Sequence, residues 1–446
     1  MTDALSIFAA ARETPRSTAL KHGAQAFSFS ELADLTRDRL RALQAELRPA
    51  TPFPLTGVNT LEVVVSLYAL LEQRAPVLLL HPRLTAAERE FETQAAARHY
   101  LSGQPDVAAI LYTSGTTGRP RGAVLTRSAL VASARASATN LGWYDDDCWL
   151  LAMPLGRIGG LSIVTRCLAA RKTVALEPAC DAATLPARID ATRSTLVSVV
   201  PTMLAQALDA HPDWMAPAHL RAILVGGAAA PAGLLQCSAQ RRLPIVITYG
   251  CTETCSQIVA TPYAKRYEAA ACGAGRPLTG AELRILGGHI QARGPMLMAG
   301  YLGEPPLPAG DWFDTGDLGS LDEQGCVHIH ARRADLVVTG GENVYPAEVE
   351  HTLAKCPGIR EAGVFGVQDE IWGQTVAAAL VATQLPPDDA TLMSYLSERL
   401  APYKRPRQIC FVPSLPHTPA GKLDRDALQG FAPCLRPLRA AVTAAT

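Results

Sequence analysis

The chain has 446 residues, which at roughly 100–200 residues per domain predicts two or three domains. Lysine plus arginine and aspartate plus glutamate both number 41, so the formal net charge is zero. This balance excludes the broad basic surface that general nucleic-acid or anionic-membrane binding needs. The 11 cysteines are scattered without a Cys-x-x-Cys pair. We therefore expect free thiols in a reducing compartment rather than a disulfide framework or a metal site.

The N-terminal segment carries acidic and basic residues early and does not resemble a secretory signal. The most apolar stretch, residues 63–71, is far shorter than the roughly 20 residues that cross a membrane. We therefore predict a soluble cytoplasmic protein without stable membrane insertion.

Short apolar runs alternate with helical segments over most of the chain. Candidate strands are residues 76–82, 106–113, 172–178, 194–201, 220–227 and 243–250, and candidate helices include 127–141 and 202–210. This alternation predicts an α/β fold with buried, largely parallel or mixed stacked sheets and a ligand site beyond the carboxyl ends of the strands.

The pattern changes after about residue 276. Shorter strands with tight turns predict an antiparallel or barrel-like section. A helix at 348–354 and strands at 363–367 and 376–382 then predict a small α+β unit. We place the boundary near 331–334, which gives an N-terminal domain of residues 1–333 and a small mobile C-terminal domain of residues 334–446.

Residues 112–122, YTSGTTGRPRG, have the composition of a polyphosphate-binding loop. Glycines let the backbone turn and expose successive N–H groups, while hydroxyls and arginines add donors and charge. The loop lacks the Gly-Lys-Ser/Thr ending of a Walker A motif, and its composition alone leaves an ordinary turn as an equal alternative. Its candidate ligands are Thr113, Ser114, Gly115, Thr116, Thr117, Gly118 and Arg121.

This loop begins an ordered series of motifs along the chain. GGAAAP (226–231), YGCTE (249–253), FDTGDLG (313–319), ARRADLVVTGGENVYPAEVE (331–350), PYKRPR (402–407) and LPHTPAGKLDR (415–425) follow in order. Together they resemble the acyl-adenylate-forming superfamily, which includes acyl- and aryl-CoA synthetases, over about residues 5–430. Within it, the length and the segments PLGRIGGLSIVTR, VVPTMLAQAL and LVGGAAAP are most similar to o-succinylbenzoate–CoA ligases of menaquinone biosynthesis.

The resemblance implies a nucleotide site with ATP, Mg²⁺ and coenzyme A as cofactors. Tyr249, followed by Gly250, would stack on adenine, or else be a core tyrosine. Backbone groups of Gly227 and Ala228 would receive the adenine amino group. Asp317 would accept both ribose hydroxyls, the alternative being a turn aspartate.

The same resemblance implies the residues that meet the phosphates. Thr252 would bind the α-phosphate, and Glu253 would hold Mg²⁺, which prefers hard oxygen ligands. Arg332 would reach the ribose, unless it is a surface arginine. Lys422 would be the catalytic lysine that lets one anion attack another, although a lone loop lysine is ordinarily solvated. The small domain would then swing and replace Lys422 by the 340–346 loop for thiol transfer.

The chain departs from the family pattern at several positions. Arg121 replaces a usual Lys, Ala334 stands at the hinge position, and His417 replaces a common Arg. Arg157 stands in place of a frequent His or aromatic near the acyl pocket, for which Gly159 and Gly226 are further candidates.

These features give a ranked set of functions. We predict an acid–CoA ligase that acts on o-succinylbenzoate, with Arg157 or Arg166 pairing with a second carboxylate; a rim charge is the equal alternative for Arg157. A benzoate-type aryl-CoA ligase is the close alternative. A carrier-loading adenylation protein and a non-catalytic nucleotide-binding regulator are the competing classes, and a homodimer is one assembly considered.

Overall fold

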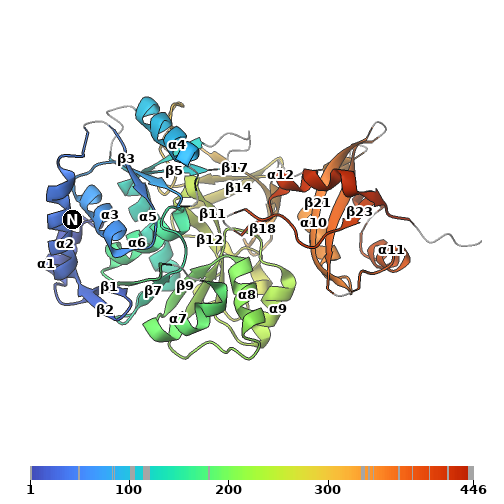
Figure 1. Cartoon of the computed structure of the whole chain (residues 1–446), viewed down its shortest axis with the longest axis horizontal. Coiled ribbons are helices and arrows are strands. Elements are labelled where there is room, and N and C mark those ends of the chain that lie inside the picture. The colour runs from blue at the N-terminus through green and yellow to red at the C-terminus, as the bar shows by residue number, and fades with distance from the viewer. Residues whose placement is uncertain are drawn as a thin grey trace, which may run out of the picture.

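The computed structural model describes residues 3–48, 51–82, 84, 86–100, 106–113, 121–178, 181–332, 337–339, 342–344, 346–369, 372–383, 385–400, 402–418 and 421–439. Sheets and helices alternate through the first three quarters of the chain, as the sequence predicts (Figure 1). Within these residues no helix is both long and apolar enough to cross a bilayer.

A nine-stranded sheet forms the centre of the N-terminal part. Its order is β13-β12-β11-β10-β9-β7-β8-β1-β2, and the strands from β11 through β1 run parallel to one another. The bounds are β1 Thr18–His22, β2 Gln25–Ser28, β7 Cys148–Leu151, β8 Thr173–Leu176, β9 Leu196–Val199, β10 Ala222–Val225, β11 Ile245–Cys251, β12 Ser256–Ala260 and β13 Arg276–Pro277. Strands buried on both faces must be apolar throughout, which is why the predicted runs were so hydrophobic.

A second, five-stranded sheet carries the predicted phosphate loop. Its order is β16-β6-β5-β4-β3, with bounds β3 Phe53–Thr56, β4 Val77–Leu80, β5 Val107–Thr113, β6 Arg121–Thr126 and β16 Gly300–Tyr301. Strands β5 and β6 pair antiparallel, with Thr113 opposite Arg121. Strand β6 therefore lies between the loop and the helix at 127–141. Residues 114–120 lie outside the described part of the chain.

Helices cover both sheets. Their bounds are α1 Ile7–Glu13, α2 Phe29–Leu43, α3 Leu61–Glu72, α4 Ala86–His99, α5 Arg127–Leu141, α6 Ile158–Ala170, α7 Leu185–Thr192, α8 Pro201–Ala210 and α9 Ala232–Gln240, with short 3₁₀ turns η1 Ala182–Thr184, η2 Thr252–Thr254, η3 Tyr263–Lys265 and η4 Ala269–Cys272. Side chains of α5 and α6 share one apolar core with strands of both sheets. Because α6 is apolar on nearly every face, it is buried rather than amphipathic.

The change of pattern after residue 276 corresponds to a four-stranded antiparallel sheet. Its order is β14-β15-β17-β18, with bounds β14 Glu282–Leu286, β15 His289–Arg293, β17 Phe313–Leu321 and β18 Val327–Arg332. In β17 and β18, Asp317 lies opposite Arg332. This pairing brings two residues of separate sequence motifs to one place.

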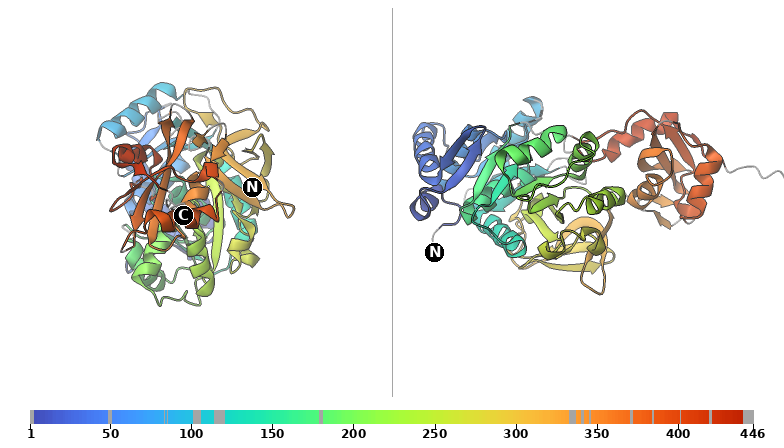
Figure 2. Two further views of the ribbon diagram at one scale, coloured as in Figure 1. Left: turned by 90° about the vertical axis from the view of Figure 1, so that its right-hand side faces the viewer. Right: turned by 90° about the horizontal axis from the view of Figure 1, so that it is seen from below.

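The last sheet takes all its strands from residues 337–437. It contains β19 Val337–Thr339, β20 Glu342–Val344, β21 Ile359–Asp369, β22 Gly373–Ala382, β23 Gln408–Phe411 and β24 Arg436–Pro437, with α10 Pro346–Leu353, α11 Asp389–Ser397, α12 Arg425–Leu428, η6 Pro402–Lys404 and η7 Gln429–Cys434 around it. It has apolar clusters of its own. Figures 1 and 2 place this part, in orange and red, at one end of the molecule. The predicted boundary at 333/334 falls outside the described residues.

The expectation of free thiols is wrong at one pair. Cys272 and Cys326 form a disulfide although they are 54 positions apart in the sequence. The backbone brings them together, since Ala274 donates to the Val327 carbonyl and Val327 donates to the Gly275 carbonyl. Sequence spacing could not reveal this contact, because it arises where the η4 loop lies along β18.

This disulfide predicts a measurable effect of reductant on stability. Closing a loop of this length lowers the entropy of the unfolded chain, which stabilises the fold by up to about 4 kcal/mol. We expect Cys272→Ser to lower the free energy of unfolding in urea and to abolish the effect of dithiothreitol. Cys434→Ser, at an exposed free thiol, is the control. Eleven titratable thiols in denatured, unreduced protein would contradict the bond.

Candidate functional site

Residues from separate motifs converge where strands β5, β10 and β11 end. Thr113 ends β5, the 226–231 turn follows β10, and Tyr249 and Gly250 lie in the last residues of β11. Because β10 and β11 are parallel, their carboxyl ends meet at one edge, where the sequence analysis placed the ligand site.

Tyr249 and Asp317 are joined by a hydrogen bond. The Tyr249 hydroxyl lies 2.8 Å from Asp317 Oδ2 and 3.0 Å from Thr315 Oγ1. Asp317 is buried at 6% exposure, so it is not the solvated turn aspartate that its Gly-Asp setting allowed. Burial, reinforced by the charge of Asp317, raises the pKa of Tyr249 far above its ordinary value. The phenol therefore stays protonated beside the carboxylate.

The 226–231 turn depends on two glycines. A Cβ on Gly226 would lie 2.2 Å from Thr248 Oγ1, so any side chain there would collide with β11. Gly227 has φ +81°, a conformation that L-residues rarely adopt. Ala228 follows in the exposed part of the turn. The backbone of this turn is thus open toward the ends of the strands.

Lys422 reaches this turn from the C-terminal part of the chain. A Cβ on Gly227 would lie 3.9 Å from Lys422 Cε, so the lysine stem lies against the turn. The preceding Gly421 lies against the first turn of α8, because a Cβ there would lie 2.6 Å from Thr202 Oγ1. Within its loop, Lys422 is held by Thr418, which donates its amide to the Lys422 carbonyl at 2.7 Å. The structure thus brings the predicted lysine to the other motifs.

Glu253 is held by two hydroxyl groups. Its Oε1 accepts from Tyr301 at 2.8 Å and lies 3.3 Å from the Thr113 hydroxyl. Burial, and next the charge of Glu253, raise the pKa of Tyr301 far above its ordinary value. Thr252 precedes Glu253 in the same 3₁₀ turn. Sequence reasoning missed Tyr301, since the two-residue strand β16 that carries it has no recognisable motif.

Arg121, the replacement for the usual Lys, contacts a second residue that the sequence analysis missed. Its guanidinium forms two hydrogen bonds with the Glu304 carboxylate, Nε to Oε1 at 2.9 Å and a second through the other oxygen. The same guanidinium lies 3.5 Å from the centroid of the Tyr301 ring. Burial alone would lower the pKa of Arg121. The hydrogen bond to Glu304 and the negative charges nearby have the larger combined effect, so the pKa of Arg121 is raised.

Several predicted site residues cannot be placed in this geometry. Ser114, Gly115, Thr116, Thr117 and Gly118 lie outside the described residues, as does Ala334. Arg332 ends β18 opposite Asp317, and only its backbone is described. Gly250, in contrast, is placed by the structure, where it pairs with Gln257 between β11 and β12.

The two arginines considered for the acyl pocket differ in their surroundings. Arg166 is 3% exposed and lies over the ring of Trp149, within the core. Arg157 precedes α6, and its buried Nε has no hydrogen-bond partner among the described residues. Burial lowers the pKa of Arg157, and the charge of Glu92 opposes that shift. Burial also raises the pKa of Glu92 to about 7, against the charge of Arg157. The buried Nε of Arg166 likewise has no partner among the described residues, so the two arginines differ in exposure: Arg157 is half-buried, whereas Arg166 is enclosed in the core.

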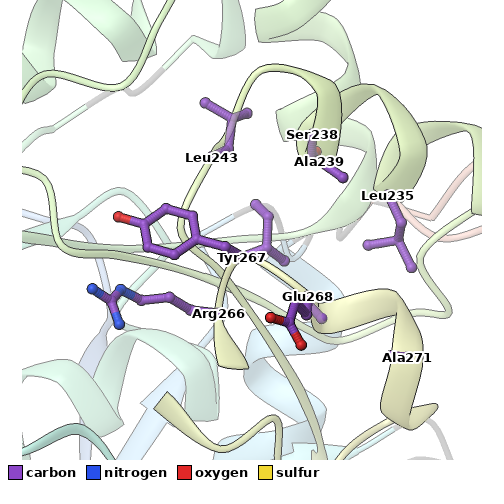
Figure 3. Close-up of a pocket in the computed structure, with 10 residues that line it drawn as sticks. Leu235, Ser238, Ala239, Leu243, Arg266, Tyr267, Glu268 and Ala271 are labelled. Carbon is purple, nitrogen blue, oxygen red and sulfur yellow. The ribbon is translucent and has the colours of Figure 1, made fainter. Parts of the chain in front are cut away.

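Gly159, the second residue of α6, faces Met153. A Cβ on Gly159 would lie 3.3 Å from Met153 Cε, so little space is available for a larger residue. A separate hollow of about 220 Å³ lies at the other end of β11, lined by Leu235, Ser238, Leu243 and Tyr267 (Figure 3). Since β11 begins there and reaches Tyr249 only at its far end, this hollow is distinct from the converging motif residues.

Comparison with known proteins decides the family. The model of the AMP-binding enzyme family matches residues 92–302, and that of the AMP-binding enzyme C-terminal domain matches residues 348–422. A 2-succinylbenzoate–CoA ligase from Bacillus licheniformis is 36% identical over 93% of this chain and 97% of its own length. The chain belongs to the AMP-binding enzyme family. It is accordingly an AMP-forming acid–thiol ligase, of the acyl-adenylate-forming superfamily that the ordered motifs indicated.

Other relatives agree with this placement. A 2-succinylbenzoate–CoA ligase from Geobacillus kaustophilus is 36% identical over 94% of the chain and 96% of its own length. The structure of o-succinylbenzoate–CoA synthetase from Bacillus subtilis in complex with its acyl-adenylate intermediate superposes with a TM-score of 0.88, at 31% identity over 96% of this chain and 98% of that one. The same enzyme with ATP and magnesium gives a TM-score of 0.86.

Proposed function

We propose that this AMP-binding enzyme is a 2-succinylbenzoate–CoA ligase that uses ATP, Mg²⁺ and coenzyme A. The relatives that match nearly the whole chain carry this activity in their names. The observation that carries the proposal within this chain is the position of Lys422, against the turn that packs on Thr248, the residue before Tyr249 in β11. A cation there would meet both the acid and the α-phosphate.

The reaction has two steps. A carboxylate oxygen of the acid attacks the α-phosphorus of ATP, and the bond from that phosphorus to pyrophosphate breaks. Lys422 would offset the repulsion between the two anions, with Thr252 donating to the α-phosphate. The coenzyme A thiol then attacks the acyl carbonyl, AMP departs, and the thiol proton goes to solvent.

The residues present fit the nucleotide and its metal. Tyr249 would stack on adenine beside the backbone of Gly227 and Ala228, while Asp317 and Arg332 would bind the ribose. Residues 113–118 and Arg121 form the proposed phosphate loop. Glu253 presents a hard carboxylate oxygen between two hydroxyls, and Mg²⁺ is ordinarily bound by one or two carboxylates together with phosphates. When bound, Mg²⁺ would neutralise phosphate charge.

The division into residues 1–333 and 334–446 is part of the proposal. It is supported by the last sheet, which takes every strand from beyond residue 336. Rotation of the smaller domain would withdraw Lys422 and bring in the 340–346 loop for thiol transfer. A homodimer and a cytoplasmic location are proposals of the same standing, which light scattering and cell fractionation can test.

Acid-dependent release of AMP and pyrophosphate is the decisive test. We expect turnover with ATP, coenzyme A and o-succinylbenzoate, and much less with benzoates, short-chain acids or fatty acids. A preference for benzoates would favour the aryl-CoA ligase instead. Turnover that requires a carrier protein, or ATP binding without pyrophosphate release under any acid, would contradict the proposal.

Arg157 provides a test of substrate choice. Its half-buried side chain, with an unpartnered Nε among the described residues, suits the second carboxylate of o-succinylbenzoate, whereas Arg166, whose Nε is unpartnered too, is enclosed in the core. A hydrogen-bonded charge pair contributes about 1.5–3 kcal/mol, or roughly 10–100-fold. We expect Arg157→Ala to lower kcat/KM for o-succinylbenzoate by that factor.

The comparison acid for this test lacks the second carboxylate. We expect benzoate to be used equally poorly by the parent protein and by Arg157→Ala, and Arg157→Lys to retain part of the preference. An equal loss for both acids would show that Arg157 does not read the second carboxylate.

A further inference from the structure

The Glu253 side chain is oriented by hydroxyl groups from two other segments of the chain. Thr113 comes from the end of β5, Tyr301 from β16 and Glu253 itself from η2. The Glu253 carbonyl also accepts from the Met298 amide at 2.7 Å, which ties η2 to the segment before β16. Both printed side-chain contacts reach the same carboxylate oxygen, Oε1. The direction of this carboxylate is therefore set by its neighbours rather than by its own rotamer.

The position of the Tyr301 hydroxyl depends on the first strand after the phosphate loop. Tyr301 pairs with Ala123 in the β16–β6 ladder, and Leu302 donates to the Gly122 carbonyl at 2.8 Å. Arg121 begins that strand, and its guanidinium covers the Tyr301 ring. The ring is thus fixed by its backbone on one side and by a cation on its face.

Glu304 completes the arrangement by fixing the guanidinium. It accepts two hydrogen bonds from Arg121, so the planar cation can lie flat on the ring while its edge faces the carboxylate. A lysine ammonium is a point charge without this planar fork, so it could not make the two parallel hydrogen bonds to Glu304 while lying flat on the ring. The replacement of the family's usual Lys therefore accompanies a contact that suits the geometry of Arg.

We propose that Tyr301 is a positioning residue that aims Glu253 at the metal, and that Arg121 and Glu304 hold the Tyr301 ring in place. This inference rests on the proposed function, because it assigns Glu253 to Mg²⁺. The Arg121 and Glu304 side chains are 33% and 44% exposed, so their ion pair contributes little to stability. Its contribution is geometric: it connects the end of the phosphate loop to the carboxylate that meets the metal.

The test removes one hydroxyl. Tyr301→Phe keeps the ring and its stacking on Arg121 but leaves Oε1 of Glu253 without its 2.8 Å donor. We expect the half-saturating Mg²⁺ concentration for adenylation to rise about tenfold. Thioester formation from a supplied acyl-adenylate should not change. Glu304→Gln, which leaves the proposed phosphate-loop residues in place, should produce a smaller shift in the same direction, and Tyr267→Phe, at an exposed tyrosine elsewhere, none.

Direct metal binding provides a readout independent of turnover. We expect Mn²⁺, followed by electron paramagnetic resonance in the presence of a non-hydrolysable ATP analogue, to bind about tenfold more weakly to Tyr301→Phe. Unchanged Mn²⁺ affinity and Mg²⁺ response in Tyr301→Phe would overturn this inference while leaving the proposed function intact. Absence of acid-dependent pyrophosphate release in the parent protein would instead overturn the proposed function.

Discussion

Replacing Lys422 by Ala is expected to lower the rate of adenylation at least ~100-fold, because electrostatic stabilisation at a developing charge commonly contributes this much or more. Lys422 Cε lies against the Gly227 turn, so the ammonium is within the cluster of motif residues. The measurement is acid-dependent pyrophosphate release under saturating ATP.

Measuring the second half-reaction distinguishes the loss of a catalytic group from a loss of folding. Thioester formation from a supplied acyl-adenylate should be largely retained in Lys422→Ala, because the lysine would be withdrawn during that step. Lys355→Ala, at an exposed lysine of α10's C-terminal side, should leave both steps unchanged. Equal loss of both half-reactions in Lys422→Ala would remove Lys422 from the role proposed for it.

The sequence predicted helices and strands of the two large sheets because, in these segments, the local hydrophobic pattern agrees with the burial. The predicted helix at 127–141 is α5, Arg127–Leu141, and the apolar runs correspond to strands of the two parallel or mixed sheets. A strand buried on both faces has little choice but to be apolar, so its sequence is informative. The helix predicted at 348–354 is found at Pro346–Leu353, a shift at the ends that hydrophobic periodicity does not resolve.

The same reasoning failed where a contact joins distant segments. The Cys272–Cys326 disulfide, and the reach of Tyr301 and Glu304 to the phosphate-loop side of the site, depend on tertiary placement. Motif spacing carries no information about such placement. It also left Arg166 beside Arg157 as a candidate for the second carboxylate, although burial over Trp149 places Arg166 in the core. Lys422 lies near the Gly227 turn and Asp317 near Tyr249, and the roles predicted for both residues remain predictions.

Glu253→Gln is the second substitution with a large expected effect. The amide oxygen can still accept from Tyr301 and Thr113, so the local hydrogen bonds survive while the negative charge is lost. A metal site that keeps its shape but loses its charge should bind Mg²⁺ more weakly. We expect adenylation at low Mg²⁺ to fall on the order of 100-fold, since this charge assists phosphate displacement.

Raising the Mg²⁺ concentration distinguishes the two ways in which Glu253→Gln could lose activity. If Glu253 acts through the metal, added Mg²⁺ should recover part of the rate, and the double variant Glu253→Gln with Tyr301→Phe should be little worse than Glu253→Gln alone. Once the Glu253 charge is gone, orienting this side chain through the Tyr301 hydroxyl no longer changes metal binding. The effects of the two substitutions are therefore not additive. Glu268→Gln, at an exposed acid beside the hollow at the start of β11, is the matched control and should behave as the parent. A Glu253→Gln protein with the parent's Mg²⁺ response would mean that the phosphates are neutralised from elsewhere in the site.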